Sequence, residues 1–371
     1  MLVTLEAESF RNLAPLAWRP GPGRHLLLGG NGAGKTSVLE AIYAVATTRS
    51  FRTPRLAECI RHGAAGFRLA AEVEDRARSA LAVAYAADAA AGPGGGAGEG
   101  LTRTVNGHRV PLSEHLAAQP VVAWTAADAE IVSGPPVRRR RFLDRGVVGL
   151  KPAALDALRR YREALAEKRN LLARWPPGAA ADPRSLEAWN RVLATAAVEV
   201  TRLRAAYSGE LERELGAVLA ETGLPTPRVA LAYRPSPAAA LEGVEPLVER
   251  LARAAPAEGR RGMPLVGPHR DELEIRWGDH PAAQVASAGE RKLLSLALTA
   301  AHGRVLVRAE REPVHLLDDL DAELAADTLA AAWRVFAGAA QLVATSNRPG
   351  VWETLPVDRR WQLMEGRIET A

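Results

Sequence analysis

The 371-residue sequence contains one cysteine, Cys59, so it cannot form a disulfide within the chain. This shortage of cysteine fits a reducing compartment. The first six residues alternate as a β-strand does and lack the charged segment that opens a signal peptide. No apolar run is long enough to cross a bilayer. We therefore expect a soluble, cytoplasmic protein that makes no use of a membrane.

Aromatic residues make up only 5% of the chain, and none of them alternate with basic residues in a stripe on which bases could stack. Metal-ligand spacing is also missing, because His269 has no cysteine or second histidine at a suitable distance. We expect His269 to be a hydrogen-bonding residue, either structural or linked to the nucleotide. The net charge of +5 is small, so the distribution of charge matters more than its sum.

The sequence does contain one glycine-rich stretch of strong character, Gly29-Gly30-Asn31-Gly32-Ala33-Gly34-Lys35-Thr36. It matches G-x-x-x-x-G-K-[ST] and stands between an apolar strand pattern at 25–28 and a helical pattern at 37–45. Glycines let backbone N–H groups converge on a phosphate, and the following helix adds its positive dipole end. Lys35 would reach the β- and γ-phosphates, and Thr36 would ligate Mg²⁺. A turn that only caps a helix needs neither residue, so the stretch predicts a site for ATP.

Two acids, Asp318 and Asp319, follow the apolar strand pattern at 314–317. In a phosphate-loop ATPase this position holds Mg²⁺ through the first carboxylate and polarises the attacking water through the second. The alternative is a pair of solvated acids that cap the next helix. Many such ATPases have glutamate in the second place, so the shorter Asp319 predicts slow hydrolysis. We predict Asp318, Asp319 and Lys35 as the catalytic residues, with Thr36 and Asp318 at the metal.

Ser287 and Gly289 precede a leucine-rich helical pattern. Ser287 can cap that helix and Glu290 can complete a capping box, which explains these residues without any ligand. The alternative is an ABC-type signature, in which Ser287 and Gly289 bind the γ-phosphate of ATP held by another subunit. The position of the segment, about one helix and a turn before Asp318, favours the signature.

Secondary-structure patterns change twice along the chain. Strand-like segments lie at 67–73, 80–86 and 101–105, with an Ala/Gly-rich loop at 87–100, whereas 138–221 is almost purely helical and includes a long helix at about 185–221. Strand patterns return at 229–233 and 273–277. We predict an N-terminal ATPase part at 1–137, an α-helical lobe at 138–262 and a C-terminal ATPase part at 263–371. The two outer parts should form one sheet, with the nucleotide at the carboxyl ends of its strands.

Several of these segments, in the same order, resemble the RecF family of ABC-type ATPases. The segments that carry the resemblance are Phe10-Arg11-Asn12, the glycine-rich stretch, Arg49-Ser50-Phe51-Arg52, Gly134 to Asp144, Tyr161 with Lys168-Arg169-Asn170, and Val266 to Asp271. They cover nearly the whole chain. The resemblance implies an α/β fold, an ABC-type P-loop ATPase head with an inserted α-helical lobe.

The same resemblance implies an activity. Two subunits would dimerise on ATP, close on double-stranded DNA at a gap or junction, and help RecR and RecO to load RecA during DNA repair, recombination, replication restart and the SOS response. A weak, DNA-stimulated ATP hydrolysis would reset this switch. Four positions depart from the family pattern: Ala126-Ala127 replaces a Pro-acid pair, Glu290 replaces Gln, Ala325 replaces Asp, and Ser346-Asn347 stands where many ABC enzymes use His. These departures affect hydrolysis more than ATP binding.

Basic residues gather in two places. Between 138 and 174 there are twelve Lys or Arg against four Asp or Glu, and a second group lies at 49–61. Neutralising several phosphates gives salt-dependent, sequence-independent affinity for DNA. The alternative is a solvated helix face, and Arg138 to Arg141 surround a helix, so that some should pair internally, with Asp144 as one partner. We predict DNA contacts from Arg49, Arg52, Arg55, Arg138 and Arg139.

Two other functions fit a phosphate loop. A kinase of a small metabolite would need an acceptor pocket and would have no use for a signature helix. The motor subunit of an ABC transporter would need a coupling surface and a glutamine loop, and the basic helical insert argues against it.

Overall fold

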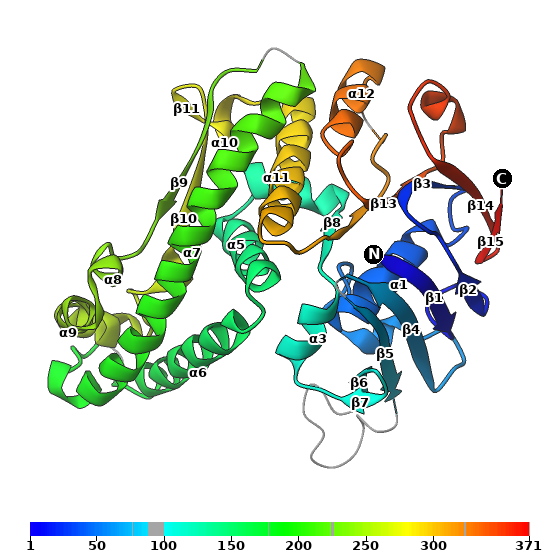
Figure 1. Cartoon of the computed structure of the whole chain (residues 1–371). Coiled ribbons are helices and arrows are strands. Elements are labelled where there is room, and N and C mark those ends of the chain that lie inside the picture. Colours follow the sequence, from blue (N-terminus) through cyan, green and yellow to red (C-terminus); the bar gives the residue numbers. More distant parts are fainter. Residues whose placement is uncertain (76, 88–99, 177, 224–225, 323, 371) are drawn as a thin grey trace. The chain divides into compact units, whose positions relative to one another are not determined.

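The computed structural model describes residues 1–75, 77–87, 100–176, 178–223, 226–322 and 324–370, and most of the predicted loop at 87–100 lies outside them. The chain divides into two compact units (Figure 1). The first unit comprises Met1–Ala129, Ala217–Leu224 and Ala288–Ala371, and the second comprises Glu130–Gly216 and Pro225–Ser287. The domain boundaries predicted at 138 and 262 stay a prediction. No described helix is long and apolar enough to cross a membrane.

The first unit contains a mixed sheet that joins both ends of the chain. Its described strands, in spatial order, are β15 (Arg367–Thr370), β14 (Arg359–Met364), β3 (Gly23–Leu28), β13 (Gln341–Ser346), β12 (Val314–Leu317) and β8 (Val121–Trp124). β14, β3, β13, β12 and β8 run parallel, and β15 is antiparallel at the edge. Four consecutive buried residues in β12 fit a strand covered on both faces. The predicted union of the N- and C-terminal parts in one sheet is confirmed.

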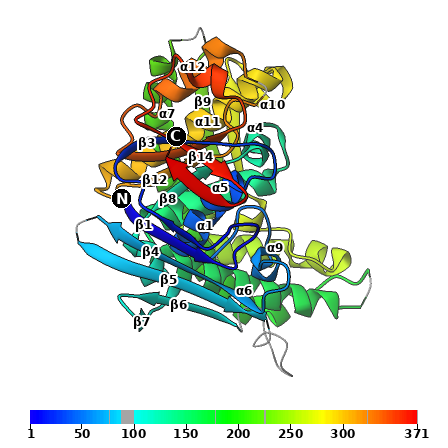
Figure 2. The same ribbon diagram turned by 90° about the vertical axis from the view of Figure 1, so that its right-hand side faces the viewer.

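A second, antiparallel sheet of the first unit was not predicted as separate. Its described strands, in spatial order, are β2 (Leu16–Trp18), β1 (Leu2–Glu8), β4 (Gly66–Glu74), β5 (Arg78–Ala86), β6 (Leu101–Val105) and β7 (His108–Arg109), as Figure 2 shows. The predicted strands at 67–73, 80–86 and 101–105 are confirmed. Positive φ angles of 50° at Asn106 and 80° at Gly107 form the tight turn between β6 and β7.

Helix α1 (Lys35–Thr47) contributes to the hydrophobic core that both sheets share, with residues from β1, β4, β5, β12 and β13. The other described helices of this unit are α3 (Leu112–Ala118), α11 (Ala288–Arg308) and α12 (Ala326–Arg334). α11 is buried along most of its length, and its Ser295 Oγ accepts a hydrogen bond of 2.9 Å from Trp124 Nε1. The leucine-rich pattern after Gly289 therefore packs α11 against β8.

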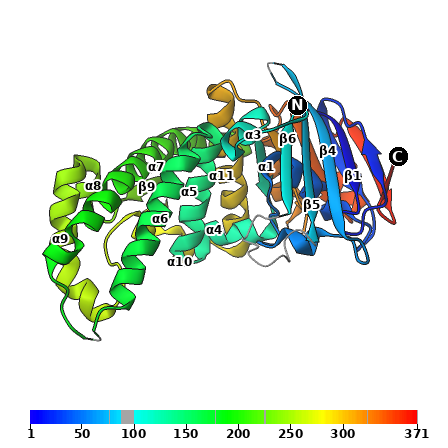
Figure 3. The same ribbon diagram turned by 90° about the horizontal axis from the view of Figure 1, so that it is seen from below.

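The second unit is largely helical (Figure 3). Its described helices are α4 (Glu130–Ser133), α5 (Pro136–Leu150), α6 (Ala154–Ala173), most of α7 (Glu187–Thr222), α8 (Ala239–Glu242), α9 (Val244–Arg261) and α10 (Ala282–Val285). The long helix predicted at about 185–221 is confirmed as α7. The predicted strand at 273–277 exists as β10 (Glu272–Trp277), but it does not join the ATPase sheet. It pairs with β9 (Val229–Arg234) and β11 (His280–Pro281).

Candidate nucleotide-binding site

The glycine-rich stretch forms the turn between β3 and α1, and geometry requires glycine at several of its positions. Gly34 has a φ of 107°, which side chains rarely adopt, and a Cβ on Gly29 would lie 2.4 Å from the Leu363 carbonyl oxygen. By contrast, a Cβ on Gly30 or Gly32 would meet nothing within 4 Å. The loop is therefore packed tightly against the Leu363 backbone at Gly29 and has free space at Gly30 and Gly32, where a phosphate could approach the backbone closely.

Lys35 lies over this loop. Its Nζ donates hydrogen bonds of 2.8 Å to the Gly29 carbonyl and 3.0 Å to the Gly30 carbonyl, and the residue is buried. Both acceptors are neutral, so an anionic phosphate oxygen would compete well for the same ammonium group. The structure thus places Lys35 where the sequence motif predicts it.

Two asparagines support the loop, and the sequence had suggested no role for the first. Asn12 Nδ2 donates a hydrogen bond of 2.7 Å to the Gly32 carbonyl, while Asn12 Oδ1 accepts a hydrogen bond of 2.7 Å from Ser37 Oγ on α1. Asn347, which follows β13, donates 3.0 Å from Nδ2 to Asn31 Oδ1. The only earlier signal for Asn12 was its place in the Phe10-Arg11-Asn12 segment.

Asp318 meets the phosphate loop at the carboxyl ends of β12 and β3. Its Oδ1 accepts 2.9 Å hydrogen bonds from Thr36 Oγ1 and from Thr345 Oγ1 on β13. Burial raises the pKa of Asp318, and the negative charge of Asp319 adds to this effect. Asp319 itself is exposed, has a φ of 46°, and donates its backbone N–H to Thr345 Oγ1 at 2.8 Å.

The oxygen atoms of Thr36 and Asp318 fit a magnesium ion. Mg²⁺ prefers oxygen ligands and usually takes only one or two carboxylates, the rest of its shell being water and phosphate. A divalent cation would also offset the burial that raises the pKa of Asp318. The described residues hold no group of three or more His, Cys, Asp or Glu that could bind a metal ion.

Ser287 and Gly289 lie at the N-terminus of α11, a helix of 21 residues. Both are exposed, and a Cβ on Gly289 would meet nothing within 4 Å. An exposed helix N-terminus with an open glycine suits an anion brought by another molecule. The signature role of these two residues stays a prediction.

The end of β13 and the residues after it are bonded to the acidic turn that follows β12. Asp321 is buried, and its Oδ2 accepts 2.8 Å from Ser346 Oγ, whereas its carbonyl accepts 3.2 Å from the Arg348 side chain. Sequence reasoning did not single out Asp321. Its signal was a third acid close to Asp318 and Asp319.

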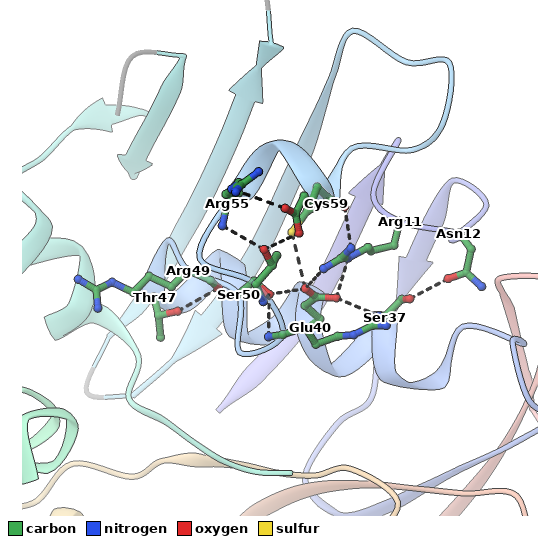
Figure 4. Close-up of polar contacts among 12 residues, drawn as sticks. Arg11, Asn12, Ser37, Glu40, Thr47, Arg49, Ser50, Arg55 and Cys59 are labelled. Atoms are coloured by element: carbon green, nitrogen blue, oxygen red, sulfur yellow. Dashed lines mark hydrogen bonds and ion pairs between the residues drawn. The ribbon is translucent and has the colours of Figure 1, made fainter. Parts of the chain in front are cut away.

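Glu40 on α1 organises the basic loop that carries Arg49, Arg52 and Arg55 (Figure 4). The Glu40 carboxylate is fully buried and accepts bidentate hydrogen bonds of 2.7 and 2.9 Å from Arg11, as well as one from Ser50. Arg52 approaches the same carboxylate at 3.5 Å while half of its side chain stays exposed. Arg55 is 3.8 Å from Glu58, and Arg49 is exposed and points away from Glu40. The loop therefore presents arginines on a fixed base.

The two predicted DNA contacts on α5 differ from each other. Arg138 is partly exposed and lies 2.9 Å from Glu130. Arg139 is only 12% exposed and binds Glu272 of β10 through two bonds of 2.6 and 2.9 Å, with further donation to the Gly134 carbonyl. Its guanidinium holds α5 against β10. DNA contact by either residue stays a prediction, and Arg139 is the less available of the two.

The expected pairing of Arg138 to Arg141 with Asp144 is wrong. Asp144 pairs instead with Arg204 of α7 at 2.8 Å, and Arg140 donates 2.9 Å to the Asp271 carbonyl. The Asp271 side chain accepts 2.9 Å from Arg204, 2.8 Å from the Ser236 N–H, and a further bond from the Tyr233 hydroxyl. A partner more than 50 residues away cannot be inferred from the helical pattern alone.

His269 forms structural hydrogen bonds, one of the two roles expected of it. The Tyr161 hydroxyl donates a hydrogen bond of 2.7 Å to His269 Nδ1 and accepts one of 3.0 Å from the His269 backbone N–H. Burial, with a smaller contribution from the charges of Arg270, Arg169 and Arg140, lowers the pKa of His269 to about 4. The imidazole is therefore neutral near pH 7 and ties η4 (Pro268–Arg270) to α6.

The model of the RecF/RecN/SMC N-terminal domain matches residues 1–358. The DNA replication and repair protein RecF of Anaeromyxobacter sp. is 34% identical over 332 residues, which cover 87% of this chain and 85% of that protein. RecF of Chlorobium phaeovibrioides is 30% identical over 368 residues, which cover 94% of this chain and 95% of that protein.

Solved structures agree on the fold. A structure of the recombination mediator protein RecF-ATPrS in the RecFOR pathway matches all of this chain and 98% of its own, with a TM-score of 0.85 at 22% identity. An Smc head bound to the C-terminal winged-helix domain of ScpA matches with a TM-score of 0.57 at 15% identity. The first likeness confirms an ABC-type ATPase head with a helical lobe. By its sequence and by its architecture, the chain belongs to the RecF family of DNA replication and repair proteins.

Proposed function

We propose that the chain is an ATP-dependent DNA clamp of recombinational repair. The observation that carries the proposal is the meeting of Thr36 and Asp318 at 2.9 Å beside an open phosphate loop. Thr36 lies in α1 and Asp318 directly follows β12, 282 positions along the chain, so their meeting is a property of the fold. A solved relative is described as RecF-ATP in the RecFOR pathway, which supports ATP as the nucleotide.

The chain's own groups define the chemistry of this site. Backbone N–H groups of residues 29–36 and the start of α1 would bind the phosphates, and Lys35 would exchange two carbonyls for phosphate oxygens. Thr36 and Asp318 would hold Mg²⁺, which supplies a positive charge against the phosphates. Asp319 is exposed and would orient the attacking water, and its short side chain supports slow turnover.

ATP would act as a population switch. Ser287 and Gly289 of one subunit would bind the γ-phosphate held by its partner, so that contacts across the dimer exist only in the closed state. Closure would bring the basic surfaces of both subunits onto double-stranded DNA at a gap or junction, and hydrolysis would reopen the dimer. From the family resemblance we expect RecR and RecO as partners in loading RecA.

Mass in solution, measured by light scattering, tests the switch. The wild-type chain should be a monomer without nucleotide and a dimer with ATP and Mg²⁺. Lys35→Ala should stay monomeric because it does not hold the nucleotide, and Ser287→Arg should stay monomeric while it still binds ATP. A kinase of a small metabolite has no use for a signature helix and would give no such pattern, and a phosphorylated metabolite among the products would exclude the clamp.

Nucleotide binding must be measured beside mass. Ser287→Arg that fails to bind ATP would indicate damage to the fold, and Ser287→Ala then serves as the milder variant. A wild-type mass that is indifferent to ATP would contradict the proposal.

A further inference from the structure

Five arginines of the second unit carry charges that no described carboxylate neutralises. They are Arg169 and Arg174 at the end of α6, Arg260 and Arg261 at the end of α9, and Arg270 in η4. All five side chains are exposed, and in the described part of the chain none forms an ion pair. We call them the α6–α9 arginine cluster.

The ends of α6 and α9 are held together (Figure 1). Lys168 Nζ lies 2.7 Å from Glu258 Oε2, and both side chains are fully buried. Gly262, which ends α9 with a φ of 63°, is so close to α6 that a Cβ on it would lie 3.7 Å from the Leu172 carbonyl oxygen. The arginines beside these contacts therefore stand on one rigid base.

Arg270 belongs to the same cluster. Its neighbour His269 is bonded to Tyr161 on α6, and the positive charges of Arg270 and Arg169 both contribute to the lowered pKa of His269. Within 166–174 and 258–270 the acids are Glu167 and Glu258, and Glu258 is paired with Lys168. In these two segments, Glu167 is therefore the one remaining acid that could offset the charge of the five arginines.

Several other arginines of this unit, in contrast, are engaged in ion pairs. Arg138, Arg139, Arg159, Arg160, Arg191 and Arg253 all lie within 4 Å of a carboxylate. A paired arginine has to give up its partner before it can bind a phosphate, whereas a member of the cluster does not. The aromatic residue beside the cluster, Trp175, packs on a small apolar core, so the surface offers charge without base stacking.

We infer that the α6–α9 arginine cluster, rather than Arg138 and Arg139, is where the second unit contacts the phosphate backbone of duplex DNA. This inference rests on the proposed function and names the surface it uses. Helix dipoles offer another explanation for Arg174, Arg260 and Arg261, because cations stabilise helix C-termini. That explanation covers neither Arg169 nor Arg270, and it predicts an effect on stability alone.

Salt dependence of DNA binding separates these explanations. The full chain, with ATP and Mg²⁺, is titrated with a fluorescent duplex between about 50 and about 200 mM salt. The test variant is Arg169→Gln/Arg260→Gln/Arg270→Gln. The matched control is Arg159→Gln/Arg191→Gln/Arg253→Gln, which removes the same charge from exposed but paired positions of the same unit.

Each lost phosphate contact reduces the magnitude of the slope of log affinity against log salt by about 0.9. The slope of the test variant should therefore be smaller by about 2.7, and that of the control by much less than about 0.9. Thermal unfolding of both variants reports any loss of helix-end stability. Equal slopes for the test variant and the wild type, or equal losses for test and control, would overturn the inference while leaving the clamp intact. A wild-type chain that binds no duplex would overturn the inference and the proposed function together.

Discussion

Two sites of this chain, one in each unit, treat buried charge in opposite ways. At the phosphate loop, the carboxylate of Asp318 is bonded by two neutral hydroxyls, and the ammonium of Lys35 by two neutral carbonyls. In the second unit, Asp271 is bonded by Arg204 and the buried Lys168 faces Glu258. The charged groups of the first site have only neutral partners within the protein, whereas those of the second site are paired with groups of opposite charge. A charged residue is therefore a functional candidate only after its partners are known.

The largest effect is expected from breaking the buried charge network of the second unit. Arg204 is 5% exposed and pairs with Asp144 and with the fully buried Asp271. Arg204→Ala leaves Asp271 buried without its cation, which should reduce the free energy of unfolding by about 3–5 kcal/mol. Denaturant titration measures this loss. A loss below about 1 kcal/mol would show that Tyr233 and Ser236 alone satisfy Asp271.

Removing the charge of Asp318 from the phosphate site should, unlike Arg204→Ala, leave the free energy of unfolding without nucleotide unreduced. Burial raises the pKa of Asp318, so its ionised form is disfavoured in the fold without ligand. Asp318→Asn should therefore not lower the free energy of unfolding without nucleotide. It should abolish the stabilisation by ATP and Mg²⁺, which amounts to about 2.7 kcal/mol at a hundredfold excess over Kd. Unfolding curves with and without ATP and Mg²⁺ test both parts, and a large loss without nucleotide would contradict the comparison.

Acid should produce an effect that is smaller per pH unit. Burial lowers the pKa of His269 to about 4, below the ordinary value of 6.5. Between these values the unfolded chain binds the proton and the folded chain does not, so stability falls as pH drops from 6.5 towards 4, by at most about 1.4 kcal/mol per pH unit. His315 adds a similar slope, because burial lowers its pKa to about 4 as well.

The contribution of His269 is isolated by His269→Gln, measured against the wild type at several pH values. The variant should lose the part of the slope that His269 causes and keep the rest, including the part that His315 causes. Identical slopes for the two proteins would mean that the ring of His269 is protonated in the folded chain without cost.

Local patterns predicted much of this molecule. The strand, turn and helix around Gly29 to Thr36 follow from residue spacing, and so does the acid at the end of β12. Side-chain partners did not follow, because they depend on contacts between distant segments. The pattern of α5 indicated that Arg138 to Arg141 surround a helix, but not that Glu272 lies against Arg139. Likewise, alternation predicted β10 without showing that β9 is its neighbour.

The smallest effect separates two adjacent arginines of α5. Arg138 and its partner Glu130 are 40% and 51% exposed, so Arg138→Gln should change the free energy of unfolding by less than about 1 kcal/mol. Arg139→Gln removes a bidentate, largely buried pair with Glu272 and should cost about 1.5–3 kcal/mol. Both variants change the same charge on the same helix, so denaturant titration compares burial alone. Equal losses would mean that burial does not distinguish a structural arginine from a surface arginine. The ion pairs of the second unit could then no longer be used to locate the DNA surface.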